Sequence, residues 1–147
     1  MGLANLSFLY KTLVLEHAKS PHHYEANLPT NGHQVTLHNP TCGDTINVSL
    51  QIKDGYLNDL CFNGSGCTIS QASSSMMTDT LDGKSADDAQ KLIQGFLNLC
   101  MGKPISDELK QGLRDAAVMG TVAEFPARIK CATLAWHAVQ DILNQQK

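Results

Sequence analysis

A change in the spacing of apolar residues near position 67 constrains the fold of this chain more than any other feature. Before that position every second residue is apolar over one stretch: Ile46, Val48, Leu50 and Ile52. This period is typical of a strand with one buried face. Asp54-Gly55 is a hairpin turn signal at the end of the stretch. We therefore expect strands over 33–40 and within 45–64, forming an antiparallel meander of about three strands.

After position 67 the apolar residues recur at helical spacing. The first helix runs to Gly83, Ser85 and Asp88 form a capping box that opens a second helix through 89–102, and a third covers 106–119. The last helix begins near Pro126 and carries one stripe of mostly apolar residues: Ile129, Ala132, Thr133, Trp136, Val139 and Leu143. A further helix over 6–21 precedes the strands and ends at a proline.

Strands early and helices late predict an α+β fold. We expect a small three-stranded antiparallel sheet covered by helices, with an N-terminal helix and the C-terminal helices around it. A chain of 147 residues is long enough to build its own core, so we expect a single domain over 1–147.

Charge and cysteine usage narrow the function classes. Eleven basic and fourteen acidic residues give a net charge of −3, which offers no electrostatic footprint for nucleic acid. No apolar run approaches the roughly 18 residues of a membrane span, and the first ten residues lack a basic segment and a cleavage site, so we expect a cytoplasmic protein without a membrane partner. Five cysteines without a secretion signal argue against a disulfide framework and favour metal binding or thiol chemistry.

The stretch HNPTCGD, residues 38–44, places a thiol and a carboxylate two residues apart in a predicted turn. Cys67 follows the glycine-rich NGSG at a strand-to-helix junction, and Cys131 lies in the first turns of the last helix. Gly43, Gly64 and Gly66 supply the backbone freedom that such turns need. Three thiolates and a carboxylate form a four-coordinate set that suits zinc. We therefore hypothesise that the side chains of this turn bind a metal ion.

Three motifs in this order, NPTCGD, GSGCTISQASSSMM and FPARIKCATLAW, resemble the U-type iron-sulfur cluster assembly proteins. The resemblance runs from about residue 5 to residue 143. Within the IscU/NifU N-terminal-like superfamily the chain is more similar to SufU than to IscU. It has extra residues around 84–104, Lys130 where IscU has a histidine, and 125–129 in place of the Leu-Pro-Pro-Val-Lys chaperone motif.

The resemblance implies a metal site made of Cys42, Asp44, Cys67 and Cys131. It also implies that Cys42 accepts sulfur and that Arg128 lies beside the site, where a guanidinium would offset its negative charge. The implied cofactor is Zn²⁺, and the implied partner is a SufS-type cysteine desulfurase that uses pyridoxal phosphate, with downstream cluster assembly proteins as further candidates. The implied role is a sulfur-transfer partner of that desulfurase and not a stand-alone enzyme.

Two other functions remain open, and a third is disfavoured by the residues. The same ligands could hold a transient iron-sulfur cluster, which would make the chain a scaffold, or they could form a structural zinc domain. Structural zinc sites are typically closed by Cys or His at all four positions, which a carboxylate does not match. A cysteine hydrolase is disfavoured because no oxyanion motif or ordered base is evident.

The remaining cysteines and the histidines are expected to be structural. Cys61 and Cys100 match no ligand of the family and are predicted to be buried. No histidine pairs with another at i, i+4, so none is expected as a metal ligand: His17, His22, His23, His33, His38 and His137.

Overall fold

The computed structural model describes the backbone of residues 3–146 and the side chains from residue 8 to residue 146. The elements follow one another in the order α1 (Leu3–Lys19), β1 (His33–Asn39), β2 (Asp44–Lys53), β3 (Tyr56–Ser65), α2 (Thr68–Leu81), α3 (Ala86–Cys100), α4 (Asp107–Leu113), the 3₁₀ helix η1 (Arg114–Glu124) and α5 (Pro126–Gln145). Over these residues no helix combines the length and the apolar character required to cross a membrane.

The three strands form one antiparallel sheet in the order β1-β2-β3. Lys53 pairs with Tyr56 across a two-residue turn, where Asp54 and Gly55 have φ values of 53° and 82°. Positive φ at both central positions is the geometry of the tightest hairpins, which Asp-Gly favours. The predicted α+β fold with a three-stranded antiparallel sheet is therefore confirmed.

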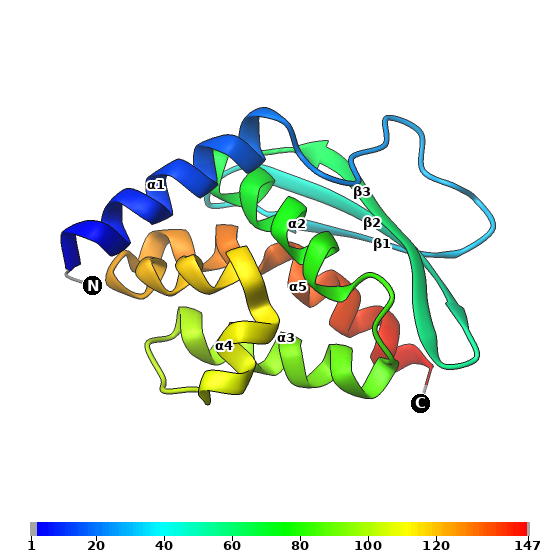
Figure 1. The fold of residues 1–147 in the computed structure, drawn as a ribbon. Helices are drawn as coiled ribbons and strands as arrows, with labels where there is room; N and C mark the ends of the chain where they lie inside the picture. The colour runs from blue at the N-terminus through cyan, green and yellow to red at the C-terminus, as the bar shows by residue number, and fades with distance from the viewer. Residues whose placement is uncertain (1–2, 147) are drawn as a thin grey trace.

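All the helices lie on one side of the sheet (Figure 1). α2 and α5 contact the strands directly, whereas α1 packs on α2 and α3 packs on α5. The sheet turns its apolar face to these helices through fully buried side chains such as Ile46, Val48 and Phe62. These residues and the buried stripes of the helices belong to one hydrophobic core.

Trp136 fixes the relative positions of three helices. Its ring, on α5, stacks on Phe96 of α3 with centroids 3.9 Å apart and planes 7° apart. Its indole N–H donates to Ser73 Oγ of α2 at 3.0 Å, and that hydroxyl donates to the carbonyl oxygen of Ala132 at 2.5 Å. Because a buried indole N–H needs a partner, this pair ties α2 to α5. The two helices carry Cys67 and Cys131, so their docking sets the distance between those thiols.

The predicted continuous helix over 106–119 is wrong. α4 ends at Leu113, and Arg114, the first residue of η1, has a φ of 53°, which breaks the α-helix there. Every third residue from there is fully buried: Leu113, Ala116, Met119 and Val122. A spacing of three matches the three residues per turn of a 3₁₀ helix, which keeps these side chains on the core side where an α-helix would rotate them away.

Candidate metal centre

The turn between β1 and β2 presents a thiol and a carboxylate on either side of Gly43. The N–H of Gly43 donates to the carbonyl oxygen of Asn39 at 2.8 Å, and Gly43 has a φ of 73°, which a residue with a Cβ seldom adopts. Cys42 is partly exposed on this turn, whereas Asp44 begins β2 and is buried. The turn therefore holds one side chain at the surface and one inside.

The Asp44 carboxylate is held by three hydrogen-bond donors from different parts of the chain. Its Oδ1 accepts from the N–H of Cys67 at 2.8 Å and from Ser70 Oγ at 3.1 Å, and its Oδ2 accepts from Asn39 Nδ2 at 3.1 Å. Burial alone would raise the pKa of Asp44, but the Cys67 N–H, with Cys131, Asn39 and Ser70, lowers that pKa below its ordinary value. The site thus contains a buried carboxylate that stays ionised.

Cys67 occupies the N-cap of α2, next to that carboxylate. Its Sγ accepts from the N–H of Ser70 at 3.5 Å, and negative charge is favoured at a helix N-terminus. The preceding residue must be glycine, because a Cβ at Gly66 would lie 2.5 Å from Asp44 Oδ1. The glycine lets the chain pass closely enough for the Cys67 N–H to reach Asp44.

Cys131 brings the last thiol from α5 and is only 1% exposed. Its Sγ lies 3.0 Å from the Sγ of Cys42 and 3.5 Å from Asn39 Nδ2. Burial raises the pKa of Cys131, and its contacts with Cys42, Asp44 and Cys67 raise it further. A bound cation reverses this preference, because it stabilises the thiolate form.

Three of the four proposed ligands form one compact group. The ligand atoms of Cys42, Asp44 and Cys131 all lie within 4.8 Å of one another. Cys67 lies outside this group but touches it through Asp44 and Cys131. Next to the group, Asn39 Oδ1 is buried and has no hydrogen-bond partner among the described residues. Thiols beside an ionised carboxylate are the donors that zinc prefers, so the residues fit a zinc ion.

Arg128 stands at the exposed edge of the group, one helical turn before Cys131. Its pKa is raised by interaction with Cys131 first, and then by the charges of Cys67 and Cys42. A cavity of about 340 Å³ opens beside it, lined by Tyr10, Cys67, Thr68, Ile69, Phe125 and Arg128. The guanidinium therefore faces the thiols from the solvent side.

The sequence profile described as NifU-like N terminal domain matches residues 9–132. The chain belongs to this family. The NifU-like domain is 40% identical over 145 residues to the iron-sulfur cluster assembly scaffold protein IscU of Streptococcus pyogenes serotype M1, covering 99% of this chain and 89% of that protein. It is 37% identical over 137 residues to the zinc-dependent sulfurtransferase SufU of Bacillus subtilis, covering 93% and 90%.

Solved structures show the same fold. The NifU-like domain superimposes with a TM-score of 0.78 and 25% identity on the putative iron-sulfur cluster assembly scaffold protein for the SUF system from Fervidobacterium islandicum AW-1. The match covers 92% of this chain and 97% of that one. The chain is therefore a member of the iron-sulfur cluster assembly scaffold family.

Two residues of this NifU-like domain that support the site were not predicted from the sequence. Asn39 donates to both Asp44 and Cys131, and Ser70 donates to Asp44. Asn39 stands inside the NPTCGD motif, and Ser70 follows Cys67 by three residues, which is the spacing of a cap and its partner. Both features can be seen in the sequence, but neither residue was expected to be a metal ligand.

The other two cysteines of the NifU-like domain are buried away from the site. Cys61 is 7% exposed on β3, and Cys100 is fully buried at the end of α3. Burial raises the pKa of the Cys61 thiol and raises that of Cys100 to about 12. Cys100 belongs to the hydrophobic core, and Cys61 is buried beside a surface cavity, so both are structural residues, as the sequence predicted.

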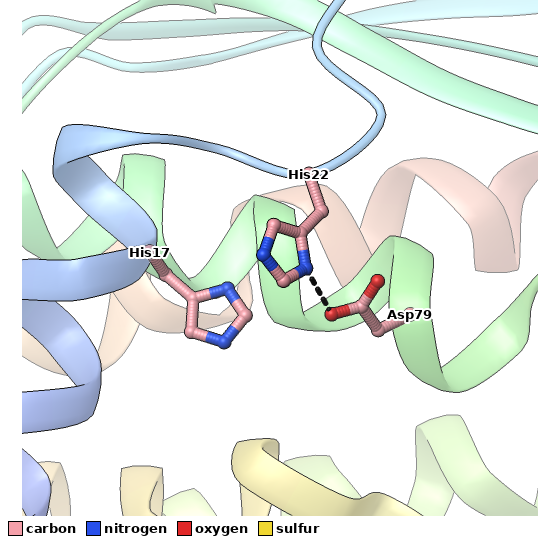
Figure 2. Close-up of side chains that lie close together, drawn as sticks. All are labelled: His17, His22 and Asp79. Atoms are coloured by element: carbon pink, nitrogen blue, oxygen red, sulfur yellow. Dashed lines mark hydrogen bonds and ion pairs between the residues drawn. The ribbon is translucent and has the colours of Figure 1, made fainter.

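Two histidines of the NifU-like domain take part in a group that the sequence did not predict. His17, His22 and Asp79 offer ligand atoms that all lie within 4.8 Å of one another (Figure 2). His17 and His22 stand five residues apart and do not share a helix, so no local spacing indicates the group. It forms because α1 packs against α2.

Proposed function

We propose that this chain is a zinc-dependent sulfur acceptor for iron-sulfur cluster assembly. It takes persulfide sulfur from a SufS-type cysteine desulfurase and stimulates the turnover of that desulfurase. The observation that carries the proposal is the compact group of Cys42, Asp44 and Cys131, with one of its thiols at the surface. The relative named as a zinc-dependent sulfurtransferase supports it. A cytoplasmic location and one domain over 1–147 are part of the same proposal.

Accessibility and attachment favour Cys42 as the sulfur acceptor. Cys131 is 1% exposed, so a partner's persulfide cannot reach it without rearrangement. Cys67 is partly exposed, but the N–H of Ser70 holds its sulfur at the start of α2. Cys42 lies on a turn and has no backbone donor on its sulfur among the hydrogen bonds of the described residues. It is the thiol that moves most easily toward a partner.

The proposed transfer conserves atoms and electrons. The Cys42 thiolate attacks the terminal sulfur of the desulfurase persulfide, a new S–S bond forms at Cys42, and the desulfurase cysteine leaves as a thiolate. Bound zinc would keep the Cys42 sulfur ionised and positioned, although it also weakens the sulfur as a nucleophile. Attack therefore requires at least partial release of Cys42 from its ligand position.

Asp44 and Arg128 have supporting roles in the proposal. Asp44 supplies a hard oxygen ligand among soft thiolates, which makes the set easier to rearrange than four thiolates. Arg128, exposed beside the thiols, offsets the formal charge of three thiolates and a carboxylate around a divalent ion. The ligand set proposed is Cys42, Asp44, Cys67 and Cys131.

A second candidate function uses the same residues. The relative that is 40% identical is named as a cluster assembly scaffold, and the same ligands could carry a nascent iron-sulfur cluster to apo-proteins. In that case the chain would hold a coloured cluster and would not need to stimulate a desulfurase.

The test is metal analysis of the purified protein, followed by desulfurase turnover with and without it. We expect about one zinc per chain and faster turnover, with Cys42→Ser inactive and Cys61→Ser as the matched control that keeps both properties. An iron-sulfur chromophore without stimulation would favour the scaffold. Zinc that leaves turnover unchanged would favour a structural zinc domain.

A further inference from the structure

A group of two imidazoles and one carboxylate lies where the end of α1 and the following loop meet α2. His17 is in the last turn of α1, His22 is in the loop, and Asp79 is on α2 (Figure 2). The rings of His17 and His22 have centroids 4.6 Å apart, and His22 Nδ1 lies 2.5 Å from Asp79 Oδ2. None of these three residues takes part in the thiol site.

The hydrogen bonds of His17 orient one of its nitrogens for metal binding. His17 Nε2 lies 2.9 Å from a carboxylate oxygen of Asp115, so this nitrogen carries the proton and donates it. The neutral ring then has its lone pair on Nδ1, 2.7 Å from Ser75 Oγ. A carboxylate behind the protonated nitrogen of a ligating histidine is a recurrent support of metal sites, because it fixes the tautomer and raises the basicity of the other nitrogen.

The Ser75 hydroxyl holds the place that an ion would take at His17. Ser75 Oγ also accepts from the backbone N–H of His22 at 2.7 Å, so the serine connects the buried ring to the loop. An ion about 2.0–2.1 Å from Nδ1 requires the Ser75 hydroxyl to rotate away, because its oxygen lies only 2.7 Å from the same nitrogen. That rotation also breaks the hydrogen bond from the backbone N–H of His22.

His22 is placed to complete the group by a side-chain rotation. One of its ring nitrogens points toward Asp79 and the other toward His17 (Figure 2). Its side chain is 54% exposed, so its ring has room to turn once its hydrogen bond to Asp79 is broken. Ligand atoms around tetrahedral zinc lie roughly 3.3 Å apart, given Zn–N and Zn–O bonds of about 2.0–2.2 Å. The three atoms here lie within 4.8 Å, so small side-chain movements, including separation of the His22–Asp79 pair, bring them to one ion.

Charge and access also favour a cation. A surface cavity of about 390 Å³ gives entry from solvent and is lined by Glu16, His17, Lys19, Ser20, His22 and Asp115. Glu16 and Asp115 add two carboxylates to this lining, against one lysine. His23 Nε2 lies 3.6 Å from Asp79 Oδ1 and falls outside the compact group.

We propose that His17, His22 and Asp79 form a second metal site, which binds a divalent first-row ion such as Zn²⁺ through nitrogen and oxygen ligands. Imidazole and carboxylate suit such ions without a thiol. Asp79 is twelve residues from Cys67 along the same helix, or about 18 Å at 1.5 Å per residue, so the two sites cannot share an ion. An ion here would fasten the end of α1 and its loop to α2.

The test begins with the full chain already saturated with zinc at its thiols. Isothermal titration calorimetry with further Zn²⁺ should show one additional equivalent in the wild type. His22→Asn and Asp79→Asn should each weaken this second equivalent by about tenfold or more, since removal of an outer-shell partner alone costs roughly 10–100-fold. His23→Asn is the matched control, because it replaces the neighbouring histidine by the same residue. His23 has a φ of 59°, which asparagine tolerates.

The role of His17 is tested by NMR and not by mutation, because its side chain is buried. In protein labelled with ¹⁵N, the imidazole nitrogens of His17 and His22 should shift as the second equivalent binds, with the larger change at His17 on Nδ1. The proposal is overturned if the wild type takes up no second equivalent, if His22→Asn and Asp79→Asn bind it as tightly as the wild type, or if His23→Asn loses it equally. Unchanged His17 and His22 signals during binding would also overturn it.

Discussion

The two ends of α2 present ligand groups of opposite character. At its N-terminus, Cys67 adjoins Asp44 and Cys131, which are buried and held by hydrogen bonds from the backbone, a serine and an asparagine. Near its other end, Asp79 meets His22, a side chain more than half exposed on a loop. One group consists mainly of sulfur and has a buried carboxylate, and the other consists of nitrogen and oxygen and includes one largely exposed side chain.

The difference indicates how tightly each group should hold an ion. Thiolates bind zinc strongly, and ligands already held by hydrogen bonds, as Asp44 and Cys131 are, lose little entropy when the ion enters. The histidine group has three ligands, one of which must first be ordered. We therefore expect two classes of zinc affinity in one chain, and the following predictions test that separation from the largest effect to the smallest.

The largest effect should come from Cys131→Ser, which removes a buried thiolate from the tight site. We expect near-complete loss of tight zinc binding, more than the roughly 10–100-fold that outer-shell changes cost, while the histidine group keeps its weaker ion. Cys67→Ser should act in the same way. Competition with a chromogenic chelator measures both classes. Full tight stoichiometry in both variants would show that the ligand set is wrong.

The second prediction separates two neighbours on one turn. Cys42→Ser should abolish persulfide formation on the chain, because an alcohol cannot accept sulfur in this way. Asp44→Ala should still accept sulfur but should exchange zinc faster, since it loses the oxygen ligand. Each variant is incubated with a desulfurase, cysteine and an alkylating probe, and the persulfide is located by mass spectrometry. Persulfide on Cys67 or Cys131, with Cys42 unmodified, would reassign the acceptor.

The third prediction concerns the asparagine that touches two proposed ligands. Asn39→Ala removes the donor to Asp44 Oδ2 and Cys131 Sγ, so tight zinc affinity should fall roughly 10–100-fold. Asn47→Ala is the matched control, because Asn47 lies on β2 and pairs with Thr36 and Asn63 away from the thiols. Equal affinity in both variants would remove Asn39 from the support of the site.

The fourth prediction is a dependence of stability on pH at the thiol end. The pKa of Asp44 is lower in the folded chain than its ordinary value of about 3.9. Ionised Asp44 therefore contributes stability above that ordinary pKa, and this contribution disappears as the pH falls through the lower folded value. In metal-free protein, the free energy of unfolding should fall less steeply below about pH 4 in Asp44→Asn than in the wild type. Parallel curves would contradict this.

The smallest effect should come from the cysteines that lie outside both groups. Cys61→Ser and Cys100→Ser should keep zinc and sulfur transfer. Cys100→Ser should lower the free energy of unfolding by about 1–3 kcal/mol, because it places a hydroxyl in an apolar core. Urea unfolding with metal analysis measures both quantities. If either variant loses tight zinc, a cysteine has been left out of the ligand set.

Much of the fold could be predicted because its signals are local. The alternation at 46–52, the Asp54-Gly55 turn and the stripe on α5 each depend on residues close in the sequence, and all three are confirmed. The break at Arg114 was missed because helical and 3₁₀ periods are hard to separate over a few turns. The buried spacing of three from Leu113 to Val122 was the signal for it.

The two groups differed in how far the sequence could predict them. Cys42 and Asp44 lie on one turn, and the motif resemblance linked them to Cys67 and Cys131 across long separations. His17, His22 and Asp79 match no quoted motif, and only the docking of α1 on α2 brings them together. The contacts of Asn39 and Ser70 with Asp44 likewise depend on the final packing of the turn against α2.

The stack of Trp136 on Phe96 has an optical consequence. The chain contains a single tryptophan, and its buried indole donates a hydrogen bond to Ser73 in α2, the helix that follows Cys67 and carries Asp79. All tryptophan fluorescence therefore comes from the junction of α2, α3 and α5. A change in emission on adding zinc would report movement of that junction without any attached dye, and stopped-flow recording would resolve how quickly each ion acts on it.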